Sequence, residues 1–228
     1  MKASLPILLS VNGGYVDTAG YLALHGLFTT HVTGNFVTLG AAVVLGTGGA
    51  IAKLLALPMF CTVVIATRLL SATIGASALR TLLGIKVALL ILGAVLAISL
   101  GPFDSGDGWP ALFTGMTLVA AMAIQNAIHR IHMGTAPPTT IMTGNTTQIM
   151  IDLADFVRGV PADARKAIGM RLSRMSGAVA AFAAGCAAAA LLFAKLGVWC
   201  FAIPPLAAAC TLWLGESQGG AKQTPGST

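Results

Sequence analysis

Two short polar segments of this chain repeat one pattern of threonine, glycine and asparagine. Residues 29–35 read TTHVTGN, and residues 139–145, 110 positions later, read TTIMTGN. Glycine permits a sharp turn, asparagine is a good N-cap, and the free N–H groups of a helix N-terminus favour anionic or polar ligands. We therefore expect Asn35 and Asn145 to open two short helices that together bind an anion or a neutral polar solute. The expected site residues are Thr33, Gly34, Asn35, Thr143, Gly144 and Asn145, whose alternative role is to satisfy a broken backbone and fix its packing.

Asp17 and the pair Gln125–Asn126 lie inside otherwise apolar stretches. A carboxylate in the middle of a membrane span costs about 2.5–3.5 kcal/mol on insertion scales, so such a residue is a functional candidate by default. In the functional interpretation, Asp17 binds a proton or a cation while Gln125 and Asn126 contact the solute. In the alternative, Asp17 is a hydrogen-bonded acid that ties its helix to a nearby threonine or asparagine.

Asn145 begins a polar stripe at the helical spacing i, i+3, i+7 and i+10. The other members of this stripe are Gln148, Asp152 and Asp155. The stripe could line an aqueous pathway or face the cytoplasm. We favour the solvated face for Asp155 and keep both interpretations for Gln148 and Asp152.

The remaining reactive side chains predict no enzyme. The four cysteines fall inside apolar stretches and read as small buried residues. The sequence offers no Ser/His, Cys/His or HExxH arrangement and no histidine pair with ligand spacing, so we expect no catalytic residue, no metal and no cofactor.

The composition is that of a polytopic membrane protein. Apolar residues make up 56% of the 228 residues, charged residues only 9%, and the mean hydropathy is +0.87. A soluble domain carries about 25% charged residues, and one span needs about 17–25 apolar residues. Six stretches qualify as spans: 7–27, 54–72, 82–100, 109–128, 176–194 and 198–214.

Loop charge decides how the TGN segments enter the membrane. Each is followed by about twelve residues before the next loop, which is about 18 Å of helix and less than a bilayer core of about 30 Å. With six spans and two re-entrant segments, all of the 13 Lys and Arg residues except Lys53 and Lys195 fall on the cytoplasmic side. Eight full spans would leave five of the 13 outside, so the positive-inside rule favours six. The basic segment 158–174 is then a cytoplasmic loop.

Three spans in each half is an odd number, so the halves should enter the membrane in opposite senses. We therefore predict an all-α membrane protein of two three-helix inverted repeats, each with a TGN half-helix or re-entrant segment. The first repeat covers 1–106, the second covers 107–214, and 215–228 form a disordered tail. In such repeats, solute sites lie near the midplane where the halves meet.

The chain resembles the YoaK-like family of bacterial integral membrane proteins of unknown function over about residues 8–214. The residues that carry the resemblance are Gly14, Asp17, Phe28, Thr33, Gly34 and Asn35 in the first half, and Gln125, Asn126, Thr140, Thr143, Gly144 and Asn145 in the second. Ala123 stands where the family pattern leads us to expect glycine. The resemblance implies a bacterial inner-membrane protein and supplies neither a substrate nor catalytic residues.

These observations favour a membrane transporter or channel for a small polar solute or ion, with both termini cytoplasmic. The alternative is a non-transporting structural or assembly protein. In that role, a stripe of small residues at every fourth position could pack closely against a helix of another membrane protein: Ser173, Gly177, Ala181, Gly185 and Ala189. The expected partners are the lipid bilayer and the solute. An oligomer is compatible with the sequence, and the net charge of +6 reflects loop bias rather than nucleic-acid binding.

Overall fold

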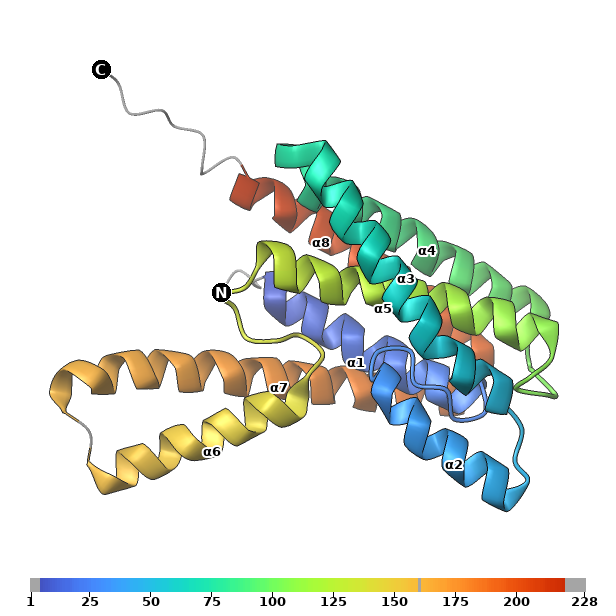
Figure 1. Ribbon diagram of the computed structural model, residues 1–228, viewed down its shortest axis with the longest axis horizontal. Coiled ribbons are helices and arrows are strands. Elements are labelled where there is room, and N and C mark those ends of the chain that lie inside the picture. The colour runs from blue at the N-terminus through green and yellow to red at the C-terminus, as the bar shows by residue number, and fades with distance from the viewer. Residues whose placement is uncertain (1–4, 160, 220–228) are drawn as a thin grey trace.

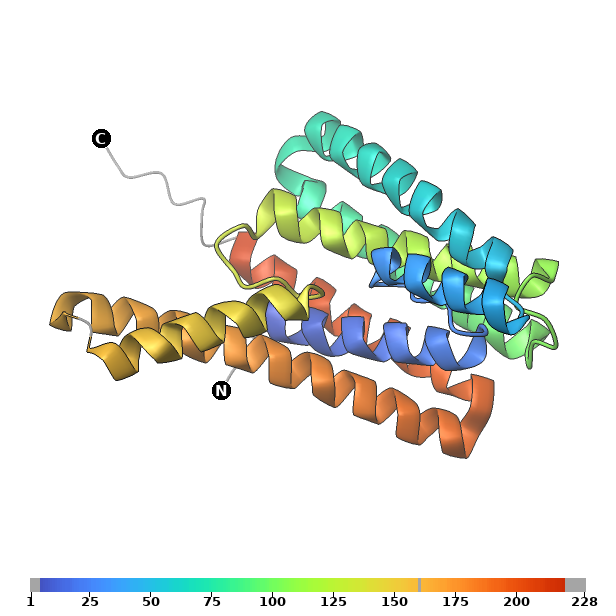
Figure 2. The same ribbon diagram turned by 60° about the horizontal axis from the view of Figure 1, so that its bottom comes forward.

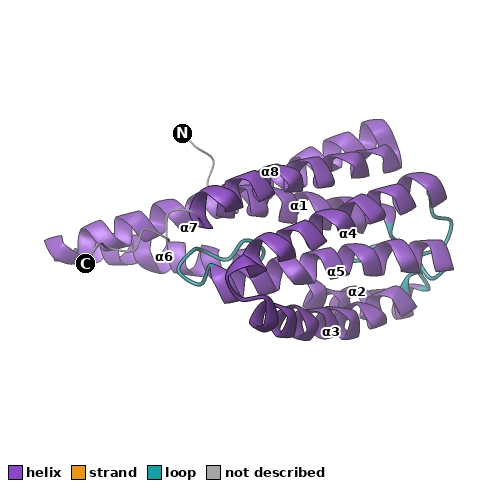
Figure 3. Ribbon diagram, turned by 90° about the horizontal axis from the view of Figure 1, so that it is seen from above, coloured by secondary structure: helices purple, strands orange, loops and turns teal. Residues whose placement is uncertain are grey.

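The computed structural model describes residues 5–159 and 161–219, and every regular element in these ranges is helical (Figure 3). The α-helices are α1 (Leu5–Ala23), α2 (Asn35–Leu45), α3 (Ala50–Ile74), α4 (Ala78–Leu100), α5 (Trp109–His132), α6 (Met142–Arg158), α7 (Ala162–Leu196) and α8 (Ile203–Gly219). Three 3₁₀ turns connect them: η1 (Val32–Gly34), η2 (Gly75–Ser77) and η3 (Gly197–Ala202). The predicted all-α fold is confirmed.

Three continuous helical stretches are long and apolar enough to cross a membrane. They are Ala50–Leu100, which contains α3 and α4, Trp109–His132, which is α5, and Ala164–Leu212, which lies within α7 and α8. Their outer surfaces are apolar as well, since Ile65, Leu191 and Leu206 are each more than 60% exposed. Large apolar side chains gathered on the outside of a bundle indicate contact with lipid.

The two halves of the chain do not form separate bundles, because long helices of one half pack on helices of the other. α1 packs mainly on α7, and α5 packs on α3 and α4. α8 contacts α1 and α4. Each helix of the first half also runs opposite to the helix in the same place of the second half (Figure 1). For example, α1 and α5 run in opposite directions, as do α4 and α8.

Small residues explain the close packing of α1 on α7. A Cβ on Gly185 would overlap the carbonyl oxygen of Val11, and a Cβ on Gly14 would overlap that of Phe182. Ala189 is fully buried in the same contact region of α7. The stripe of small residues is thus used inside the molecule, where it lets two helix backbones approach each other.

The prediction of a loop over 158–174 is wrong, because α7 already begins at Ala162. Charged side chains do not break a helix, and the alanine, arginine, lysine, methionine and leucine residues of this segment are strong helix formers. At 35 residues, α7 is about 52 Å long, well over the thickness of a bilayer core. Its first half and α6 form a hairpin that projects from the body (Figure 2). α8 includes residues 215–219 of the expected tail, and 220–228 lie outside the described residues.

Two loops are held together at the opposite end of the molecule from this hairpin. The carboxylate of Asp107, in the α4–α5 connection, accepts hydrogen bonds from the backbone N–H groups of four successive residues, Gly49, Ala50, Ile51 and Ala52, at 2.8–3.3 Å. These N–H groups open α3 and have no partner inside the helix, so a carboxylate stabilises them. The α2–α3 and α4–α5 connections therefore belong to one face of the protein.

Candidate functional site

The segments that precede the two TGN motifs meet on α1 at Gly13. From one side, the hydroxyl of Thr30 donates to the carbonyl oxygen of Gly13 at 3.4 Å. From the other side, a Cβ on Gly13 would lie 3.3 Å from the carbonyl oxygen of Thr139 and 3.3 Å from Nε2 of Gln125. A side chain here would be tight against the second segment and Gln125, and the first segment binds the carbonyl oxygen of the same residue, so Gly13 marks where the two halves of the site join.

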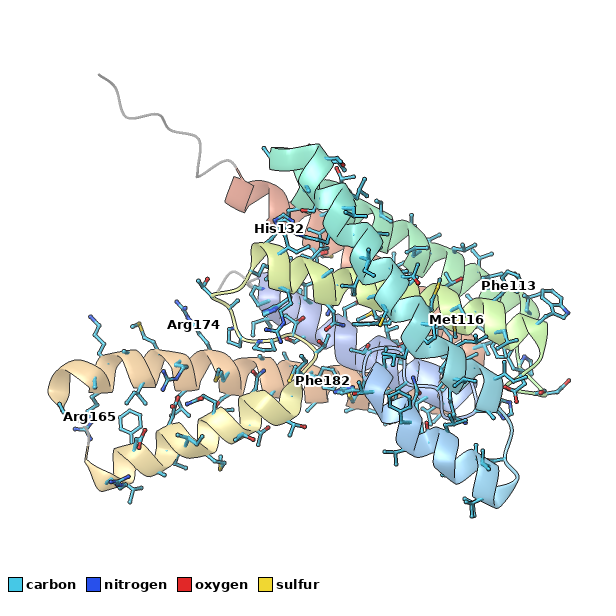
Figure 4. The ribbon with its side chains drawn as sticks, in the orientation of Figure 1. Phe113, Met116, His132, Arg165, Arg174 and Phe182 are labelled. Atoms are coloured by element: carbon cyan, nitrogen blue, oxygen red, sulfur yellow. The ribbon has the colours of Figure 1, made fainter. Side chains whose placement is uncertain are left out.

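Asp17 organises the first segment. Its Oδ1 accepts from the backbone N–H of Thr30 at 2.7 Å and from the hydroxyl of Thr29 at 3.4 Å, and its Oδ2 lies 2.6 Å from Nδ1 of His31. This hydrogen bond raises the pKa of His31 above the usual value for histidine, because the carboxylate favours the protonated ring. The His31 ring also packs edge-on against Phe182 of α7, with 5.4 Å between ring centroids, so the first segment contacts the second half (Figure 4). Asp17 therefore binds nearby threonines, as the alternative interpretation of this residue predicted. It also places a carboxylate at the site.

Gln125 and Asn126 hold the second segment in a similar way. Nε2 of Gln125 donates to the hydroxyl of Thr139 at 3.3 Å and to the backbone oxygen of Leu9 at 2.8 Å. The hydroxyl of Thr140 donates to Oδ1 of Asn126 at 2.6 Å. In both halves, therefore, polar side chains of a long helix bind a threonine pair that starts the TGN segment.

The two motif asparagines are not N-caps, contrary to the sequence-based expectation. Nδ2 of Asn35 donates to the backbone oxygen of Phe28, and its Oδ1 accepts from the N–H of the same residue, both at 2.8 Å. Nδ2 of Asn145 donates to the backbone oxygen of Pro138 at 2.9 Å. Each side chain binds the backbone seven residues earlier and so closes a loop. A partly buried peptide group in a loop has no helical partner, so it needs these hydrogen bonds. Pro138 has no N–H, so the second loop is closed by one backbone bond instead of two.

This difference predicts unequal effects of two equivalent substitutions. Asn35→Ala removes two partly buried hydrogen bonds to the backbone of Phe28 and should lower the free energy of unfolding by about 2 kcal/mol. Asn145→Ala removes one backbone bond and should cost about 1 kcal/mol. Unfolding of the purified variants in mixed micelles by sodium dodecyl sulfate measures both. Equal losses, or a larger loss for Asn145→Ala, would contradict this account of the loops.

The threonine and glycine of each TGN motif lie farther out than the upstream threonines, whereas Asn35 and Asn145 are buried. Thr33, Thr143 and Gly144 are exposed, and Gly34 is half-buried against the ring of Phe28. By contrast, the four upstream threonines are at most 6% exposed: Thr29, Thr30, Thr139 and Thr140. Both threonine pairs belong to the repeated pattern, so the sequence could have indicated them. The site residues predicted above did not include them.

Gln148 and Asp152 lie away from this junction, in the α6–α7 hairpin. The buried carboxylate of Asp152 accepts from Nε of Arg171 at 2.9 Å and from Nε2 of Gln148 at 2.8 Å. Nearby, the guanidinium of Arg165 stands 5.8 Å from the ring centroid of Phe156 (Figure 4). In this structure these two members of the predicted stripe join α6 to α7.

Lys86 is a further buried polar residue, although the loop count above placed it on the cytoplasmic side. It lies in α4 and is fully buried, and its Nζ has no hydrogen-bond partner among the described residues. Gly93 of α4 packs against Leu118 of α5. α4 and α5 run antiparallel (Figure 1). Lys86 precedes Gly93 by two helical turns and Gln125 follows Leu118 by two turns, so the two residues lie at about the same level along these helices.

Gln125 and Asn12 complete this set of buried polar groups. Oε1 of Gln125 and Oδ1 of Asn12 are buried and also lack a partner among the described residues. Nδ2 of Asn12 donates to the backbone oxygen of Pro204 at 2.9 Å, which places this side chain between α1 and α8. Buried polar groups without partners are rare in folded proteins and need a reason. One buried amino group and two buried amide oxygens, on α4, α5 and α1, are thus left without partners among the described residues.

Asp17 is also reached by a cavity. A space of about 200 Å³ is lined by Asp17, Thr18, Tyr21, Leu22 and Phe28. It lies between the second half of α1 and the segment that leads to the first TGN motif. A small solute or an ion could approach the Asp17 carboxylate through it. Thr143 lines a separate, broad depression of about 690 Å³ along α6.

Within the described residues, no three His, Cys, Asp or Glu side chains are grouped as metal ligands would be. The side chains described above offer hydroxyl, amide, carboxylate and amino groups. These groups bind polar solutes and protons.

The comparisons with known proteins agree with the resemblance seen in the sequence. A family model described as "Protein of unknown function (DUF1275)" matches residues 5–214. Neither the curated proteins nor the solved structures gave a match. Since the family model covers most of the chain, the protein belongs to the DUF1275 family, the YoaK-like family that its two TGN segments indicated.

Proposed function

We propose that this protein is a bacterial inner-membrane transporter or channel for a small polar solute or ion, without enzymatic activity, and that the solute passes the junction at Gly13. The observation that carries the proposal is three buried polar atoms without partners among the described residues, Lys86 Nζ, Gln125 Oε1 and Asn12 Oδ1, on helices of both halves of the chain. A buried amino group without a hydrogen-bond partner inside an apolar bundle is costly, which is consistent with a role in binding a ligand.

An inverted repeat would place this junction at the midplane of the membrane. Two observations support the repeat: the opposite directions of corresponding helices, and the cross-packing of α1 on α7 and of α5 on α3 (Figure 1). α2 and α6 start in the middle of the molecule and run toward opposite ends (Figures 1 and 2). We infer that each TGN segment is re-entrant and that the end bearing the α6–α7 hairpin, with its arginines, is cytoplasmic.

The chemistry of the junction suggests how the solute is held. Lys86 supplies an amino group as a donor, and Gln125 supplies an amide oxygen as an acceptor at about the same level. A solute with both an acceptor and a donor would satisfy the two groups at once. Asp17, whose Oδ2 lies 2.6 Å from Nδ1 of His31, is the candidate for coupling transport to a proton gradient.

The alternative function, a structural or assembly protein, loses its main support in the structure. The stripe of small residues that would serve a partner helix packs on α1 instead, with Gly185 against Val11. An assembly role would also give no reason for an unpartnered lysine in the interior.

Flux measurements on proteoliposomes test the proposal. Stopped-flow light scattering would follow entry of urea, glycerol, sodium acetate and ammonium chloride, and a trapped pH-sensitive dye would follow protons. We expect at least one probe to enter faster than in protein-free vesicles, and Gly13→Val to reduce this flux at least ten-fold, because its side chain would fill the junction. Gly84→Val is the matched control, since a Cβ there meets open space.

Two results would argue against transport through the junction. One is a wild-type protein that admits none of the probes faster than empty vesicles do. The other is an unchanged flux in Gly13→Val. Since Gly13→Val could fail to fold, Asp17→Asn serves as a second variant of nearly the same size, and it should abolish the response to an imposed pH gradient.

A further inference from the structure

A basic cavity lies at the base of the α6–α7 hairpin, away from the Gly13 junction. Its volume is about 450 Å³, and it is enclosed by the last turn of α5, the loop 134–138 and one face of α7. Arg130, Arg171 and Arg174 contribute guanidinium groups to its lining. Arg174 rises from α7 toward the loop that follows α5 (Figure 4).

Two of these three arginines are free to bind a ligand. Arg171 is held by Asp152, with Asp155 as the other nearby acid. Arg130 and Arg174 form no ion pair with a described residue, and both are exposed to the cavity side of the protein. The cavity therefore carries a net positive charge that the protein itself leaves unbalanced.

The rest of the lining is suited to a ligand that is only partly polar. The hydroxyl of Thr135 supplies a further donor, and Pro137, Met170 and Met175 supply apolar surface. The loop is fixed rather than loose, since Nε2 of His129 lies 3.0 Å from the backbone oxygen of Ala136. Guanidinium groups bind phosphate through paired hydrogen bonds, and two of them around one cavity select a phosphate-bearing ligand.

We propose that this cavity is a binding site for a phosphate group, either the phosphodiester of an anionic phospholipid or a free organic or inorganic phosphate. The inference does not depend on transport, because it rests on charge and shape at one end of the molecule. The site lies on the face that the excess of arginine marks as cytoplasmic, where anionic headgroups meet basic cavities.

Binding to the purified full-length protein in neutral detergent tests the proposal. The probes are dioleoyl phosphatidylglycerol, glycerol 3-phosphate and inorganic phosphate, with dioleoyl phosphatidylcholine as the zwitterionic comparison, and the readout is the thermal unfolding midpoint as a function of probe concentration. We expect phosphatidylglycerol to raise the midpoint, and Arg130→Gln/Arg174→Gln to weaken its apparent affinity at least ten-fold. Arg158→Gln, an exposed arginine outside the cavity, should leave the affinity unchanged.

The probes also separate the two sources of phosphate. Stabilisation by phosphatidylglycerol alone assigns a lipid site, and stabilisation by the tail-free phosphates as well assigns a site for soluble phosphate. Arg174→Lys keeps the charge but loses the paired hydrogen bonds, so it should weaken binding by an intermediate amount. Equal effects of phosphatidylcholine and phosphatidylglycerol, no effect of any phosphate, or full affinity in the double variant would overturn the proposal.

Discussion

Replacing Lys86 with methionine is expected to make the protein more stable and to stop transport. The amino group of Lys86 is fully buried without a partner among the described residues, so it is desolvated with no compensating hydrogen bond. Methionine has a similar length and no group that needs a hydrogen bond, so the substitution removes the penalty of an unsatisfied buried polar group, which is about 1–3 kcal/mol. We therefore expect the free energy of unfolding of Lys86→Met to rise by about 2 kcal/mol and solute flux to fall at least ten-fold.

Unfolding by sodium dodecyl sulfate and the proteoliposome assay measure the two effects on the same preparation. Lys195→Met is the control, because Lys195 is exposed at the end of α7 and its substitution should change neither quantity. A Lys86→Met protein that is less stable than wild type would show that Lys86 has a structural partner. A stable variant with full flux would show that the lysine does not serve the solute.

The second large effect is expected at the contact between α1 and α7. Gly185→Ala would place a methyl group onto the backbone of Val11, and the two helices would have to separate to admit it. Overpacking of this kind typically costs 1–3 kcal/mol and sometimes more. Because the clash is with backbone rather than with a movable side chain, we expect a loss of about 3 kcal/mol and little folded protein in the membrane.

Gly177→Ala is the matched control on the same face of α7, two turns earlier. Its Cβ would lie 3.5 Å from Cδ1 of Ile7, which is an ordinary contact. This variant should be as stable as wild type or slightly more stable, because alanine favours a helix over glycine. If the two alanine variants were equally stable, α1 would not pack on α7 at Gly185.

The sequence predicted six of the helices because each of the six contains a long apolar run. All six predicted spans overlap helices of the structure, with α7 as the largest difference in its starting point. The first turns of α7 are basic, so hydropathy alone could not extend the helix to Ala162. Propensity would have done so, since nothing between Pro161 and Gly169 breaks a helix.

The candidate site was predicted only in part, because burial is a property of the packed fold. Asp17, Gln125 and Asn126 stood out as polar residues in apolar stretches, and they do contact the segments before the TGN motifs. Lys86 did not stand out, since α4 is apolar on every side and its sequence does not tell which face turns inward. Likewise, the stripe of small residues predicts a close helix contact without naming α1 as the partner.

Cysteine accessibility at the residues that flank the two TGN segments tests the central claim most directly. In a protein freed of its four native cysteines, single cysteines at the exposed positions His25, Thr47, Thr135 and Arg158 would be labelled with a membrane-impermeant maleimide. Two re-entrant segments that enter from opposite faces predict labelling of His25→Cys and Thr47→Cys in intact spheroplasts, and of Thr135→Cys and Arg158→Cys only after lysis. Labelling of the two members of either pair from different faces, or of all four from one face, would contradict it.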